Sequence, residues 1–187
     1  MQEKEHVLNI LKQAKEAVEK EDVVKLKELS NYTLHTSSIQ QDPDNVAIAV
    51  IVYSLSKIIE RKKYTYYEEW PAFYKTYVKS IDNATLSLEK DDIKEFRENI
   101  NKIRSEIGKL SGRFKKYIQD VFKKAEINKA SRVYEHGISM QQTAKLLGIS
   151  IWDLAEYTGQ TGIGDVDLSI TMPIKQRVKN AEEMFEK

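Results

Sequence analysis

The stretch IKEFRENINKIRSEIGKLSGRFKKYIQDV, residues 93–121, decides the fold class because its apolar residues recur at alternating steps of three and four. Such a heptad repeat places one apolar stripe along a helix, and the stripe needs a surface that covers it. It consists of Ile93, Phe96, Ile100, Ile103, Ile107, Leu110, Phe114, Tyr117 and Val121. We therefore expect one long helix, or two collinear ones, packed on the chain's own bundle or on a second copy.

Two glycines lie inside this stripe, Gly108 and Gly112. Each costs about 1 kcal/mol relative to alanine in a helix interior. They indicate either a break in the helix or a place where another backbone approaches closely.

Helical periodicity also dominates the chain before the heptad stripe. The sequence DPD at 42–44 marks a helix start, since Asp42 can cap the helix and Pro43 suits its first position. The helix that follows, to about Arg61, is apolar nearly all round, so it should lie at the centre of a bundle. In YTYYEEWPAFYKTYV, 64–78, we expect the aromatic side chains to pack helices together rather than to stack on single-stranded bases.

These patterns predict an all-α fold in four parts. They are an N-terminal helical bundle (1–90), a connecting heptad helix (91–128), a helix-turn-helix (129–160), and a linker, extended arm and terminal helix (161–187).

Composition limits the possible functions. Thirty Lys and Arg residues nearly balance 29 Asp and Glu, so no net field draws the whole molecule to nucleic acid or to an anionic membrane. The chain has no cysteine and three scattered histidines, so we expect no metal and no cofactor. The longest apolar run, 46–53, is far shorter than the ~20 residues that span a bilayer. We expect a cytoplasmic protein outside the membrane.

The stretch SMQQTAKLLGISIWDLAEYTG, 139–159, predicts the helix-turn-helix. Ala144 is the small residue where the two helices cross, and Gly148 is the turn glycine. Ser150 can cap the second helix, with Asp153 completing a capping box. The residues expected to lock the helices together are Leu147, Ile149, Leu154 and Tyr157.

The second helix of this unit carries no basic residue that could read base edges. Ile151 and Trp152 at its start are instead candidates for binding a protein partner. Residues 111–132 hold seven basic and two acidic residues, which predicts a basic ridge, although Asp120 could pair with Lys116 and Lys124 to make an ordinary solvated face. The candidate DNA-contact residues are Arg113, Lys116, Lys123, Lys124, Gln141, Gln142 and Lys145.

Residues 130–159 resemble the helix-turn-helix segment of small prokaryotic antitoxin-like proteins that are associated with PIN-domain ribonucleases. The resemblance implies a role in DNA binding or in neutralising a ribonuclease toxin. It rests on Ala130, Tyr134, Gly137, Ile138, Ser139, Ala144, Leu147, Gly148, Ile149, Ser150 and Trp152.

Beyond the turn, residues 166–174 alternate apolar and polar side chains, as an extended arm does. Leu168 and Ile170 of this arm are further candidates for contact with a partner. Arg132 and His136, four positions apart, resemble the Arg–His pair of helical HEPN-type ribonucleases, in which Arg holds the phosphate and His activates the 2′-hydroxyl.

From the residues and the resemblance together, the favoured hypothesis is a non-enzymatic regulator or antitoxin-like protein that binds a protein partner, with duplex DNA and a second copy of the chain as further candidate partners. The alternatives are a protein-binding adaptor without DNA contact, and a helical ribonuclease that uses Arg132 and His136.

Overall fold

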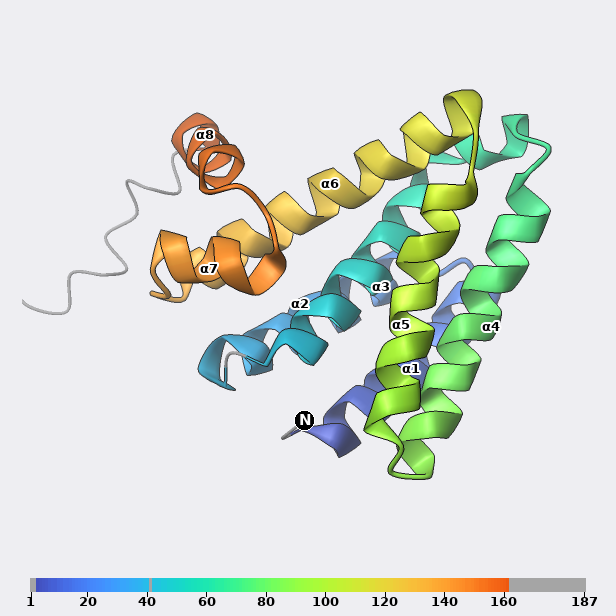
Figure 1. The fold of residues 1–187 in the computed structure, drawn as a ribbon, viewed down its shortest axis with the longest axis horizontal. Helices are drawn as coiled ribbons and strands as arrows, with labels where there is room; N and C mark the ends of the chain where they lie inside the picture. Colours follow the sequence, from blue (N-terminus) through green and yellow to red (C-terminus); the bar gives the residue numbers. More distant parts are fainter. Residues whose placement is uncertain (1–2, 41, 162–187) are drawn as a thin grey trace, which may run out of the picture.

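Eight α-helices and one short 3-10 helix make up the part of the chain that the computed structural model describes, residues 3–40 and 42–161 (Figure 1). The all-α class is confirmed, and no strand occurs within these ranges. The elements are α1 (Lys4–Glu19), α2 (Val23–Gln40), α3 (Pro43–Arg61), η1 (Lys63–Tyr66), α4 (Trp70–Glu89), α5 (Ile93–Lys109), α6 (Gly112–Glu135), α7 (Met140–Leu147) and α8 (Ile151–Thr161).

The centre of the bundle is α3, as predicted from its apolar sequence. Its N-terminus is fixed by Asp42, whose side chain accepts a hydrogen bond from the backbone N–H of Asp44 at 2.9 Å, and by Pro43 in the first turn. The helix contacts α1, α2, η1, α5, α6 and α7. Its fully covered apolar residues are Val46, Ile48, Ala49, Val50, Ile51, Val52, Leu55, Ile58 and Ile59.

Two helical hairpins, α1–α2 and α4–α5, are closed by the same turn, with the sequences E-K-E-D and E-K-D-D. The third turn residue is left-handed in both, with φ of 51° at Glu21 and 60° at Asp91. The aspartate that follows, Asp22 or Asp92, accepts a hydrogen bond from the backbone N–H three residues on, at 2.9 and 2.8 Å. The first helices of the two hairpins, α1 and α4, contact each other.

The heptad stripe does not form one long helix or two collinear ones, so that prediction for 91–128 is wrong. The chain is extended at Leu110 and Ser111, between the two glycines, and Gly112 then takes the left-handed φ of 54° that glycine adopts without strain. In Figure 1, α5 runs beside α4, whereas α6 leaves at an angle and crosses the bundle toward α7 and α8. Because α6 continues to Glu135, the predicted boundary at 128 falls inside a helix.

The stripe itself packs within the chain. Its α5 half lies in the core with Phe96, Ile103 and their neighbours buried, and its α6 half contributes Phe114 and Val121 to the same core. Among the two alternatives for the partner surface, the chain's own bundle is therefore the one observed.

The aromatic stretch packs, as predicted. The Tyr67 ring lies 4.9 Å from the Phe114 ring and 5.8 Å from the Tyr117 ring, measured between centroids. The Phe73 ring meets Phe114 edge to face at 5.7 Å. These contacts join η1 and α4 to the start of α6; Tyr66, by contrast, is 85% exposed.

Replacing Phe114 by alanine should lower the free energy of unfolding by roughly 3–5 kcal/mol, because it empties the centre of this aromatic cluster. The matched change Tyr66→Ala should alter it by no more than about 0.5 kcal/mol. Urea denaturation followed by circular dichroism measures both. Equal effects of the two substitutions would contradict the packing described here.

Candidate functional site

The C-terminal end of α6 carries two short helices, α7 and α8, joined by a three-residue turn. Gly148 in that turn has φ of 67°, a left-handed conformation, and the Ile149 N–H donates to the Ala144 carbonyl oxygen at 3.0 Å. Ala144 and Leu154 are buried between the helices. Gly148 is therefore a left-handed turn glycine, as the sequence predicted, and Ala144 is buried.

The start of α8 exposes two apolar side chains. Trp152 is 80% exposed and Ile151 is 39% exposed. Ser150 caps the helix, since its Oγ accepts a hydrogen bond from the Trp152 N–H at 3.1 Å. The Asp153 carboxylate, which was expected to complete a capping box, lies 3.2 Å from the Lys123 Nζ of α6.

The candidate DNA-contact residues are all exposed but lie in three separate places. Arg113 and Lys116 are in the first turns of α6, far from α7 along that helix. Lys123 and Lys124 line a pocket between α6 and α8.

The remaining three, Gln141, Gln142 and Lys145, line a different hollow on α7. A second hollow beside Lys145 brings in Arg97 and Arg104 of α5, two residues that the sequence analysis did not select.

Part of the basic ridge is neutralised by neighbouring carboxylates. Lys124 pairs with Asp120 at 3.0 Å, as the solvated-face alternative predicted, and Lys123 pairs with Asp153. Asp153 therefore faces α6 rather than an approaching phosphate. The ridge is less basic at its α8 end than its sequence indicates.

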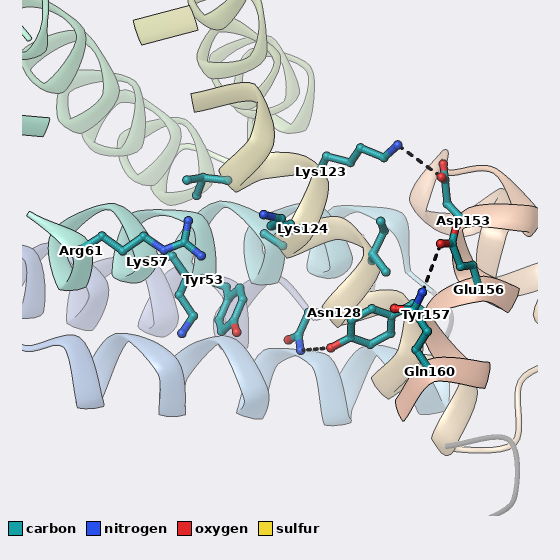
Figure 2. A pocket seen from close by; sticks show the side chains of 13 residues that line it. Tyr53, Lys57, Arg61, Lys123, Lys124, Asn128, Asp153, Glu156, Tyr157 and Gln160 are labelled. Atoms are coloured by element: carbon teal, nitrogen blue, oxygen red, sulfur yellow. Dashed lines mark hydrogen bonds and ion pairs between the residues drawn. The ribbon is translucent and has the colours of Figure 1, made fainter. Parts of the chain in front are cut away.

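The pocket between the bundle and α8 has a volume of about 500 Å³ and walls from α3, α6 and α8 (Figure 2). Figure 2 shows Lys57, Arg61 and Lys124 near Tyr53 on one side, with Glu156, Tyr157 and Gln160 on the other. The apolar part of its lining is Val121, Ala125 and Ile127.

Sequence reasoning missed the α3 wall of this pocket. Tyr53, Lys57 and Arg61 follow one another at steps of four, which places them on one face of a helix that is otherwise apolar. This row of polar side chains on an otherwise apolar helix was the sequence feature that could have indicated a pocket wall. The acidic wall of Asp153 and Glu156 was also missed, because only the tertiary fold brings α8 against α3 and α6.

Beside the pocket, one lysine is fully buried. The Lys129 side chain has no exposed surface; its Nζ donates to the Asn31 Oδ1 at 2.8 Å and lies 4.0 Å from the centre of the Tyr53 ring. Burial, with smaller contributions from the charges of Arg132 and Lys57, lowers the pKa of Lys129 from 10.5 to about 7.

Lys129 is one of the seven basic residues of 111–132, but because it is buried it adds nothing to the charge of the exposed ridge. Its position was readable from the sequence, since it continues the buried face of α6 that runs through Ile118, Phe122 and Ala125.

The Arg132–His136 pair does not reach the 500 Å³ pocket. Arg132 instead lies 3.5 Å from the Glu135 carboxylate, and His136 is exposed at the end of α6. The ribonuclease alternative stays a prediction. The arm residues Leu168 and Ile170 lie outside the described residues.

Residues 3–40 and 42–161 contain neither a metal-binding cluster nor a membrane-spanning helix. No group of three or more His, Asp or Glu side chains there is arranged to hold a metal ion. In the same ranges, no helix combines the length and apolar character needed to cross a bilayer.

Comparison of the chain with protein-family models, with curated proteins and with solved structures found no match.

Lys129→Met should stabilise the protein, most strongly at low pH. The folded-state pKa of Lys129, about 7, lies below its ordinary value of 10.5, so the unfolded chain binds more protons between these pH values. Lys129 therefore makes the free energy of unfolding rise with pH between these values. Below this range the ammonium is charged in the folded protein and destabilises it by the full amount. We expect Lys129→Met to add roughly 2–4 kcal/mol at pH ~6 and progressively less toward pH ~10.

Urea denaturation of both proteins across this pH range measures the difference. Lys116→Met, an exposed change on the same helix, should show little dependence of its effect on pH. A constant difference between wild type and Lys129→Met would contradict the assignment of a buried, depressed lysine.

Proposed function

We propose that this protein is a non-enzymatic regulator of the helix-turn-helix type whose principal contact is with a protein partner, bound through the exposed start of α8. The observation that carries this proposal is the 80% exposure of Trp152. Ile151 beside it extends the apolar surface.

An indole in this position is well suited to a protein contact. Tryptophan can bury roughly 150–250 Å² on association, and it is enriched among the residues that dominate binding energy. Ser150 fixes the first turn of α8, so the side chain is presented from an ordered helix rather than from a loop. A partner with a pocket for the indole would obtain much of its binding free energy from this one residue.

The charge around Trp152 favours protein over DNA at this surface. The exposed side of α8 offers Glu156 and Gln160 and no lysine or arginine. Base readout in the major groove relies largely on Arg, Lys, Asn and Gln side chains, with the phosphates neutralised by basic residues. A helix with this face meets few of those requirements.

The resemblance of residues 130–159 to antitoxin-like proteins gives the partner class within this proposal, a ribonuclease toxin. Binding there would neutralise the toxin by occupying its surface. The alternative of an adaptor without any DNA contact uses the same α8 surface and differs only in the role of α7.

Site-directed photocrosslinking tests the partner surface. A photoreactive phenylalanine analogue placed at Trp152 should capture one recurrent protein in the cells that produce the chain, whereas the same analogue at the exposed Tyr66 should not. Trp152→Ala should then weaken the purified complex by ~30-fold or more, the loss typical of a dominant interface residue.

A crosslink to a second copy of the chain would make the partner the homodimer. Equal yields from positions 152 and 66 would argue against this surface.

Duplex DNA is a second candidate partner because Gln141, Gln142 and Lys145 lie exposed together on α7. Amide and ammonium groups of this kind make phosphate and base-edge contacts. The α7 hollow, rather than the neutralised part of the ridge, is the surface we assign to this role.

Fluorescence anisotropy with duplex DNA at ~50 and ~200 mM salt measures this contact. Lys145→Ala should reduce the slope of log affinity against log salt by about one, the value for one phosphate contact, whereas Lys75→Ala on α4 should leave it unchanged. Binding that is absent at low salt, or equally altered by both substitutions, would exclude DNA from the proposal and leave the adaptor.

A further inference from the structure

The pocket in Figure 2 has the dimensions of a small-molecule site. Its volume of about 500 Å³ falls within the range of roughly 300–1,000 Å³ that ligand pockets occupy. Three helices from distant parts of the chain, α3, α6 and α8, form it. Its lining is half-buried aromatic and aliphatic surface with charged groups at both ends.

The end near α3 is positively charged. Lys57 bonds to Glu60 at 2.8 Å and Lys124 to Asp120 at 3.0 Å, so each retains donors but has a partner. Arg61 forms no ion pair with a described residue. A guanidinium without an ion-pair partner can donate two parallel hydrogen bonds to two oxygens of one phosphate or carboxylate.

The middle of the pocket is apolar and partly flat. The Tyr53 ring lines it, with the Lys129 ammonium 4.0 Å and the Lys57 ammonium 5.5 Å from its centre. Val121 and Ala125 of α6 complete this part of the wall. A planar ring system placed here has an aromatic face and two aliphatic side chains to pack against.

The end formed by α8 is polar and acidic. Glu156 accepts a hydrogen bond from Gln160 at 3.2 Å, which leaves carboxylate lone pairs for another donor. The Tyr157 hydroxyl and the Asn128 amide lie 3.4 Å apart at the same end. Groups of this kind can recognise the amino and ring N–H groups of a heterocycle.

We propose that this pocket binds a nucleoside monophosphate, with the phosphate at Arg61 and Lys57, the base against Tyr53, and the base's polar edge at Glu156. Neither the sequence stretch 139–159 nor the protein-partner surface at Trp152 assigns this site. The inference goes beyond the proposed function and stands or falls independently of it.

The geometry favours a nucleotide over a free anion, because a phosphate by itself could contact only the positively charged end of the pocket, at Lys57 and Arg61. Phosphate alone would leave the apolar middle and the α8 end uncovered. At the α8 end Asp153 is paired with Lys123, whereas the Glu156 carboxylate forms no ion pair with a described residue and would repel a polyanion that filled the pocket. A ligand with one anionic end and one hydrogen-bond-donating end satisfies both walls.

Isothermal titration calorimetry of the full chain with AMP, GMP, CMP and UMP tests the site, with the four corresponding nucleosides and inorganic phosphate titrated alongside. At least one nucleotide should bind with a Kd below ~1 mM, and its nucleoside and phosphate alone should each bind about tenfold more weakly or worse. No binding by any nucleotide, or binding of phosphate as tight as that of the nucleotide, overturns the proposal.

Arg61→Gln should weaken nucleotide binding by about tenfold or more, the usual effect of losing a charge-assisted hydrogen bond. Lys63→Gln removes the same charge two residues away and outside the pocket lining, so it should leave the affinity unchanged. Both side chains are exposed, so both variants should retain the wild-type circular dichroism spectrum. Equal effects of the two substitutions would reduce the binding to general electrostatic attraction and overturn the site.

Glu156→Gln tests the other end of the pocket. It should change the order of preference among the four nucleotides, because the base edge loses an acceptor while the phosphate contacts remain. An unchanged order would overturn the orientation proposed here.

Discussion

The arrangement of this protein depends on one constraint, that α3 has no polar face along most of its length. An apolar helix of 19 residues must be covered on every side, and contacts with α1, α2, η1, α5, α6 and α7 supply that cover. In the last turns of α3 Leu55, Ile58 and Ile59 remain buried, but one face carries Tyr53, Lys57 and Arg61 instead of apolar residues. The pocket therefore lies along this face, near the C-terminal end of the central helix.

A second consequence of covering α3 is the direction of α6. The aromatic cluster around Phe114 fixes the first turns of α6 against η1 and α4, and its apolar face then follows α3. The far end of α6 projects beyond the bundle and carries α7 and α8 (Figure 1). Lys129 is buried where the apolar face of α6 crosses α2 and α3. One ammonium group therefore lies within this packed region, where it contacts Asn31 and Tyr53.

Sequence reasoning predicted what local chemistry determines. The cap at Asp42, the central position of α3 and the left-handed Gly148 all follow from neighbouring residues. It left the break at Leu110 open as one of two interpretations of Gly108 and Gly112, because the heptad spacing continues unbroken through a change of direction when each half faces a different helix. It missed the pocket, whose walls are brought together only by the tertiary fold, and the ion pair of Asp153 with Lys123, which lies 30 positions earlier.

The repeated turn at Glu21–Asp22 and Asp91–Asp92 bears on how the chain folds. Each hairpin is closed by contacts within a few residues, so its formation involves little loss of loop entropy and does not wait for the other. The bundle can then assemble by docking preformed hairpins around α3 instead of searching for many distant pairings. We therefore expect the protein to fold rapidly, at a rate limited by the docking of the two hairpins around α3.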